Sequence, residues 1–155
     1  MNGPDLVFRK LGILDANREF VKRGAQVGLY YFVLNHAASQ GIGTVDITVT
    51  SPFLNDGLFR HKTAWGSKIS GNAESPRPIH LLLDTDPASA ARLFGANPMV
   101  VAGADRLQAL MGDASIDVVT AERHREIQSR CRALGISTAV FHTAKTRVVI
   151  ETRTL

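Results

Sequence analysis

The residues best suited to chemistry lie in the stretch LNDGLFRHKTAWGSKI, residues 54–69. The imidazole of His61 is the kind of group that takes a proton from an attacking amine near neutral pH. Lys62 follows directly and offers a positive charge for an anionic part of a donor or substrate. Asp56 can take part in the same site, or it can serve as a turn and N-cap residue. We therefore name Asp56, His61 and Lys62 as candidate catalytic residues, with an ordinary short amphipathic helix as the alternative.

A second group of residues is suited to holding phosphate, in the turn RGAQVG that starts at Arg23. Backbone N–H groups at the start of a helix bind anions, and the helix dipole adds to the attraction. Gly24 permits close approach of the backbone, and Arg23 adds a charge. We interpret Gln26, Val27 and Gly28 as the donors to a phosphate, with a plain helix start as the alternative.

The elements that must position these groups follow one another in the first half of the chain. Residues 27–38 are almost continuously apolar and are followed by Gly41, which predicts a buried helix and its end. Residues 44–50 alternate and are β-branched, which predicts a strand. Residues 57–65 predict a short helix that ends at Gly66.

The second half of the chain predicts strands that alternate with helices. Residues 70–78 are rich in Ser, Gly and Pro and predict a linker, so we divide the chain into residues 1–70 and 79–155. Alternation of this kind indicates an α/β fold with a parallel or mixed sheet flanked by helices. The predicted strands are 79–84, 98–102, 116–120, 136–143 and 147–154, the last two forming a C-terminal β-hairpin, and the predicted helices are 86–95, 104–112 and 121–135.

Capping signals mark the ends of two of these helices. Asp86 is a predicted N-cap, with Pro87 in the first helical position and Gly95 beyond the end. Thr120 is the predicted N-cap of the last helix, and Gly135 its stop.

The order and spacing of motifs over residues 20–70 resemble the later half of GNAT-superfamily acyltransferases. The likeness is greatest to the divergent branch near the Fem-type aminoacyl transferases. In that pattern a helix with a Gly-Leu-Tyr motif leads into a strand containing an aspartate, and an Asp-Gly-Leu…Lys…Trp-Gly segment follows. The matching residues are Gly28, Leu29, Tyr30, Ala37, Gly41 and Asp46 in the first element and Asp56, Gly57, Leu58, Lys62, Trp65 and Gly66 in the second.

The resemblance implies an N-acyltransferase that moves an acyl group from acyl-CoA, as co-substrate, or from aminoacyl-tRNA to an amine. In such enzymes backbone N–H groups stabilise the tetrahedral oxyanion. The chain departs from the pattern because Gln26 stands where the first glycine of the phosphate-binding signature is expected. It also departs because a complete domain has several elements before this helix. The expected fold is therefore GNAT-like but incomplete or permuted, completed by residues 79–155 or by another chain.

Composition limits the other function classes. Of the 155 residues 45% are hydrophobic and 21% charged, which is typical of a globular protein. The net charge of +4 is not clustered, because Glu122 and Glu126 dilute the basic segment 122–132, so we expect no nucleic-acid partner. No apolar run is long enough to span a membrane, and the N-terminus lacks a signal-peptide pattern, so we expect a cytoplasmic protein without a membrane partner.

A metal site is also not expected. Cys131 is the single cysteine, and no two histidines are spaced four residues apart on one predicted helix.

Two readings stand beside the acyltransferase. One is a non-catalytic α/β module that binds a partner chain, completes a split enzyme or forms a homo-oligomer. It is favoured by the dense apolar run GLYYFVL, which needs more covering than its surroundings offer. The other is a Rossmann-like domain built by residues 79–155 that binds a small ligand.

Overall fold

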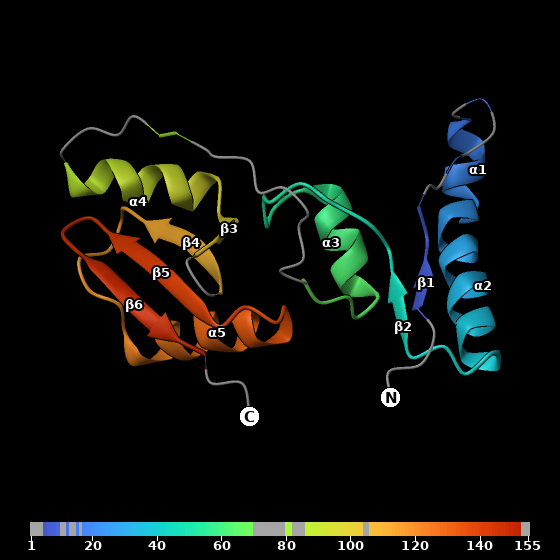
Figure 1. Ribbon diagram of the computed structural model, residues 1–155. Helices are drawn as coiled ribbons and strands as arrows, with labels where there is room; N and C mark the ends of the chain where they lie inside the picture. Colours follow the sequence, from blue (N-terminus) through green and yellow to red (C-terminus); the bar gives the residue numbers. More distant parts are fainter. Residues whose placement is uncertain are drawn as a thin grey trace. The chain divides into compact units, whose positions relative to one another are not determined.

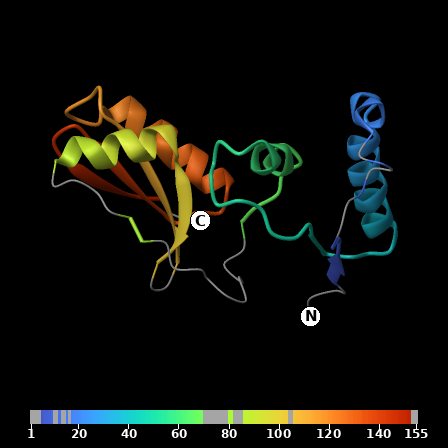
Figure 2. The same cartoon turned by 90° about the horizontal axis from the view of Figure 1, so that it is seen from above.

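The chain forms two compact units, residues 1–49 and 50–155, in a computed structural model (Figures 1 and 2). The structure describes residues 5–9, 12, 15, 17–69, 80–81, 86–103 and 106–152. Helices and two β-sheets make up a mixed α/β fold. Within the described part of the chain, no helix combines the length and the apolar character needed to cross a membrane.

The N-terminal unit is a small βαβ arrangement. Its elements are β1 (Asp5–Val7), α1 (Arg18–Lys22), α2 (Ala25–Ser39) and β2 (Thr44–Asp46), and β1 pairs parallel with β2. A parallel pair requires a crossover between its strands, and here the crossover contains the two helices. The sequence predicted that the second strand would continue to residue 50, but it ends at Asp46. The carboxylate of Asp46 accepts a hydrogen bond from the backbone N–H of Thr48, whose φ of 64° leaves the extended region.

The sequence predicted a buried helix over residues 27–38. The helix is present as part of α2, but most of its apolar surface is exposed within the N-terminal unit. Tyr30 is 4% exposed and packs edge-on against Phe8, with 5.8 Å between the ring centroids. In contrast, Phe32 is 71% exposed and Tyr31 59%. A parallel β-pair and an apolar helix normally need covering on more than one face. The N-terminal unit alone provides little of that cover.

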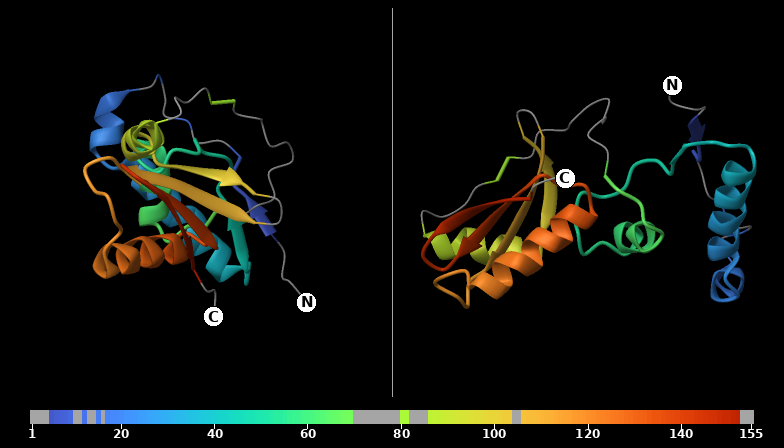
Figure 3. Two further views of the ribbon diagram at one scale, coloured as in Figure 1. Left: turned by 90° about the vertical axis from the view of Figure 1, so that its left-hand side faces the viewer. Right: turned by 90° about the horizontal axis from the view of Figure 1, so that it is seen from below.

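The C-terminal unit is a four-stranded mixed sheet between two helices. The elements are α3 (Gly57–Ala64), α4 (Pro87–Ala96), β3 (Met99–Ala102), β4 (Leu107–Asp113), α5 (Ala121–Ala133), β5 (Thr138–Thr143) and β6 (Arg147–Glu151). The sheet order is β3-β4-β5-β6, in which β4 and β5 are parallel and the two outer pairs are antiparallel. Helix α4 lies on one face and α5 on the other, as Figure 3 shows from two directions.

The main core lies on the α5 face of the sheet. Phe141 at its centre is 1% exposed and faces Ile127 and Cys131 of α5. Leu54 and Phe59, from the segment that contains α3, join the same core. Backbone hydrogen bonds join that segment to β3 and to the residue before it. Val100 donates to the carbonyl of Pro52 at 2.8 Å, and Leu54 donates to the carbonyl of Pro98 at 2.7 Å.

Helix α4 lies unusually close to β4 on the opposite face. A Cβ atom added at Gly112 would lie 2.5 Å from the carbonyl oxygen of Ala91 and 2.8 Å from its Cα. A Cβ atom at Gly95 would lie 2.9 Å from the carbonyl oxygen of Gly112. All three distances are shorter than a van der Waals contact, so only glycines allow this approach. The prediction that Gly95 follows the end of the helix is therefore wrong, since the helix continues to Ala96 and Gly95 serves packing.

Two other predicted elements are wrong. Residues 104–112 were predicted as a helix, but 107–113 form the central strand β4. Its two faces are both covered, with Ala109 and Met111 in the α5-side core and Gly112 against α4. An inner strand of this kind has no alternation of polar and apolar residues, so its sequence does not reveal it. The strand predicted at 116–120 is a loop that leads into α5.

The boundary between the units also differs from the predicted division. It falls after Val49 rather than in 70–78, because Leu54 and Phe59 pack into the C-terminal core. The predicted linker lies outside the described residues, as does most of the strand predicted at 79–84. His80 and Leu81 of that strand are described, and both are exposed outside any strand.

Candidate functional site

Asp56 is the N-cap of α3. One oxygen of its carboxylate accepts hydrogen bonds from the backbone N–H groups of Leu58, at 2.9 Å, and Phe59, at 3.0 Å. These bonds satisfy two of the N–H groups that a helix start leaves without a partner in the helix. The structure thus gives Asp56 the capping role, the second of the two roles considered for it.

His61 and Lys62 occupy the last turn of α3, where positive side chains suit the helix dipole. His61 is half-buried. Lys62 is only 6% exposed, and Phe59 on the same helix is 4% exposed. The burial of Lys62 makes it poorly placed to capture an anion from solvent. His61 is less buried than Lys62 and remains the better candidate for proton transfer, although its Nε2 atom is shielded from solvent.

The predicted phosphate turn lies at the junction of α1 and α2. Gly24 is the N-cap of α2, with a left-handed φ of 82°, and no described side chain caps the helix. Arg23 ends α1 and is exposed. The N–H of Gly28 donates to the carbonyl of Gly24 at 2.8 Å, so it already has a partner within the helix. The first-turn N–H groups that have no acceptor within the helix are therefore those of Ala25, Gln26 and Val27.

The predicted site residues fall into two separate groups. Arg23, Gly24, Gln26, Val27 and Gly28 belong to the N-terminal unit, whereas Asp56, His61 and Lys62 belong to the C-terminal unit. Within each group the residues are brought together by one turn or one short helix.

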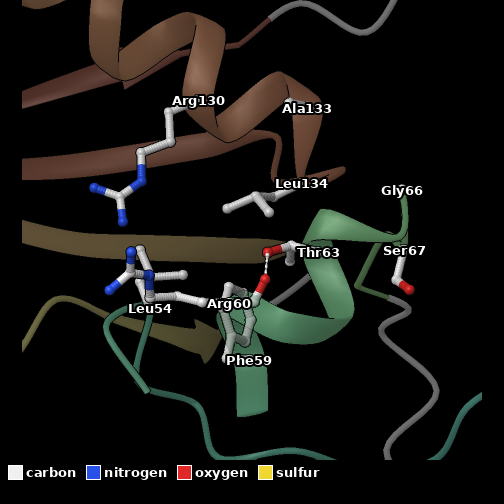
Figure 4. A pocket seen from close by; sticks show the side chains of 9 residues that line it. All are labelled: Leu54, Phe59, Arg60, Thr63, Gly66, Ser67, Arg130, Ala133 and Leu134. Atoms are coloured by element: carbon white, nitrogen blue, oxygen red, sulfur yellow. Dashed lines mark hydrogen bonds between the residues drawn. The ribbon is translucent and has the colours of Figure 1, made fainter. Parts of the chain in front are cut away.

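A pocket in the C-terminal unit is not predicted by the sequence. It lies between α3 and the end of α5 and has a volume of about 350 Å³ (Figure 4). Arg60 reaches it from α3 and Arg130 from α5, and both side chains are exposed at its edge. The residues that line it are Leu54, Phe59, Arg60, Thr63, Gly66, Ser67, Arg130, Ala133 and Leu134. Arg130 lies in the basic segment 122–132, for which we expect no nucleic-acid partner, and no local pattern links it to Arg60.

Two further titratable groups owe their pKa shifts to the fold. Burial, with a smaller contribution from Arg147, lowers the pKa of His142, whose ring lies 5.1 Å from that of Phe94 between centroids. The side-chain and backbone hydrogen bonds that Ser115 donates lower the pKa of Asp113. In the described part of the chain, no cluster of three or more His, Cys, Asp or Glu side chains is arranged to hold a metal ion.

Cys131 is a core residue rather than a nucleophile. Its side chain is fully buried, and burial raises the pKa of its thiol from 9.0 to about 11. We expect native Cys131 to react with iodoacetamide at pH 8 at least about 100-fold more slowly than the unfolded chain, because the thiolate is the reacting species. Mass spectrometry of timed samples measures this rate.

The control for this labelling experiment moves the thiol to an exposed position of the same helix. A Ser129→Cys substitution in a Cys131→Ala background should be labelled at nearly the rate of an unfolded peptide. Rapid labelling of Cys131 in the native wild-type protein would show that the core around it is open.

Comparisons with protein-family models, with curated proteins and with solved structures found no match to this chain.

Proposed function

We propose that the N-terminal unit binds the phosphates of an acyl donor such as acyl-CoA, and that the protein is a GNAT-like N-acyltransferase. The observation that carries the proposal is the start of α2, where a left-handed Gly24 precedes a helix with no side-chain cap. In the reaction, a deprotonated amine attacks the thioester carbonyl, backbone N–H groups stabilise the oxyanion, and the CoA thiol leaves.

The arrangement of the N-terminal unit supports this proposal. A helix that crosses between two parallel strands places its N-terminus at one end of them, where ligands bind in many α/β proteins. Arg23 is exposed at this end and has no ion-pair partner among the described residues. The first-turn N–H groups and the Arg23 guanidinium together suit a diphosphate.

Replacing Gln26 with Glu tests the proposed phosphate site. Gln26 is the second residue of α2, so a negative charge there interacts favourably with the positive end of the helix dipole. The substitution should therefore not lower the free energy of unfolding. The same charge should repel the diphosphate, and we expect about 10-fold weaker binding of CoA by isothermal titration calorimetry. Pantetheine, which lacks the phosphates, should bind the wild-type protein much more weakly than CoA.

The matched control is Gln40→Glu, which makes the same change at the other end of α2, where Gln40 is the C-cap residue. This variant should bind CoA as the wild type does. The proposal fails if the wild-type chain does not bind CoA, or if Gln26→Glu leaves the CoA affinity unchanged.

A second candidate function is that of a partner-completing module. The exposed Phe32 and Tyr31 of α2 favour it, since large exposed apolar side chains mark interaction surfaces. Absence of CoA binding together with a dimeric mass by light scattering would support this function over the acyltransferase.

A further inference from the structure

The pocket between α3 and α5 combines two positive charges with an apolar lining. Arg60 and Arg130 come from different helices, and Figure 4 shows their guanidinium groups on the same side of the pocket, one from each wall. No carboxylate is among the residues that line it. The pocket lies entirely within the C-terminal unit, so its role is independent of the proposed donor site on α2.

Neither arginine is neutralised by the acids near it in the sequence. Glu126 precedes Arg130 by one helical turn, but its carboxylate pairs with Arg123 at 2.6 Å. Asp56 precedes Arg60 by one turn, and its carboxylate accepts hydrogen bonds from the first turn of α3. Among the described residues, neither Arg60 nor Arg130 takes part in an ion pair. Two positive charges beside one pocket repel each other, and an anion between them relieves this repulsion.

The interior of the pocket is built from the apolar core. Leu54, Phe59 and Leu134 line it and are 1%, 4% and 8% exposed. The hydroxyl of Thr63 donates to the carbonyl of Arg60 at 3.1 Å, so it is already used within α3. Beyond the arginines the lining is therefore mainly apolar, with the hydroxyl of Ser67 as a further polar group at its edge.

We propose that this pocket binds a small organic carboxylate with an apolar body. A planar guanidinium matches a carboxylate through two parallel N–H···O bonds, and two arginines can hold one carboxylate from both sides. The apolar body of the ligand contacts Leu54, Phe59 and Leu134. A volume of about 350 Å³ is at the lower end for ligand pockets, which limits the ligand to a small molecule.

The test uses 4-phenylbutyrate as the probe, titrated into the full chain by isothermal titration calorimetry. Binding is expected at submillimolar concentration. Two other compounds separate the parts of the recognition: 4-phenylbutanamide keeps the apolar body without the charge, and acetate keeps the charge without the body. Each should bind at least 10-fold more weakly than 4-phenylbutyrate. Inorganic phosphate is a third comparison, and it should not displace the probe at equal concentration.

Charge removal at each arginine completes the test. Arg60→Gln and Arg130→Gln should each weaken binding of 4-phenylbutyrate about 10-fold, and the double variant more, as expected for loss of charge-assisted hydrogen bonds. Both side chains are exposed, so folding should be unaffected, which urea denaturation checks. The matched control is Arg132→Gln, which removes the same charge from an exposed position of α5 outside the pocket.

Several results would overturn the proposal. Binding of the amide as tightly as the carboxylate would show that the charge is not recognised. Equal affinity of the wild type and the double arginine variant would place the ligand elsewhere. Displacement of the probe by inorganic phosphate at equal concentration would indicate an anion site without selectivity for an apolar carboxylate, and lack of binding at millimolar 4-phenylbutyrate would remove the site.

Discussion

Replacing Gly112 with Ala should destabilise the C-terminal unit by about 3 kcal/mol, at the upper end of the usual cost of overpacking. The added Cβ would lie 2.5 Å from the carbonyl oxygen and 2.8 Å from the Cα of Ala91. These atoms belong to the backbone of α4, so no side-chain rotation relieves the clash and the helix must move as a whole. Urea denaturation followed by circular dichroism measures the change in the free energy of unfolding.

The control for Gly112→Ala is a Gly→Ala substitution that is expected to leave the free energy of unfolding unchanged or to raise it. Gly57 is the first residue of α3, and a Cβ atom there would meet nothing within 4 Å. Gly57→Ala should therefore leave stability unchanged or raise it by up to about 1 kcal/mol, through the higher helix propensity of alanine. If Gly112→Ala were as stable as the wild type, the close approach of α4 to β4 would be wrong.

Replacing Phe141 with Ala should cost about 4 kcal/mol, the range found when large aromatic side chains are removed from protein cores. Phe141 is 1% exposed at the centre of the α5-side core, so its removal leaves a cavity that its neighbours cannot fill without moving. The variant also loses the contact between the ring and the guanidinium of Arg123, which lies 5.7 Å from the ring centroid. The free energy of unfolding from urea titration is again the measurement.

Phe53→Ala is the matched control for Phe141→Ala. Phe53 is 40% exposed, and its pairing with Met99 uses the backbone alone. We expect the free energy of unfolding to fall by less than about 1.5 kcal/mol. A side chain that is partly exposed to water buries less apolar area, so its truncation removes less stabilisation. Equal costs at the two positions would show that the α5-side core is not organised around Phe141.

The elements that the sequence predicted well are those with local signals. Helix α5 begins after the N-cap Thr120 and ends before Gly135, whose φ is 76°. Helix α3 begins after the N-cap Asp56, and α4 after Asp86. These signals depend on hydrogen bonds between residues two or three apart, so they can be read without knowledge of the fold.

Strand β4 was not predictable in this way. Leu107, Gln108, Ala109 and Met111 are all good helix formers, and their local preference is overridden by burial between two helices. The prediction that Gly95 lies beyond the helix end was wrong for a related reason. A glycine can end a helix or allow a close contact, and only the fold decides which of the two applies.

The candidate sites also divide into those with a local sequence signal and those that depend on the tertiary fold. The turn at Gly24 and the cap at Asp56 could be located from the sequence, since each is one continuous segment. The pocket could not, because Arg60 and Arg130 are distant in the sequence and meet only when α5 packs beside α3. The burial of Lys62 is likewise a tertiary effect, which no property of the short helix indicates.

The strand order of the C-terminal sheet has a consequence for the route by which it forms. Because β3, β4, β5 and β6 are neighbours in the sheet in the order of the chain, each strand can add to the one before it. The β5–β6 pair closes the shortest loop, and the α5 crossover closes a longer one. The contacts of the α3 segment span larger separations, from residues 52–54 to β3 and from Ile69 to Leu134, and long closures cost the most chain entropy. We therefore expect the sheet to assemble early and the α3 segment to dock last, so the wall of the pocket that carries Arg60 is the final part to fold.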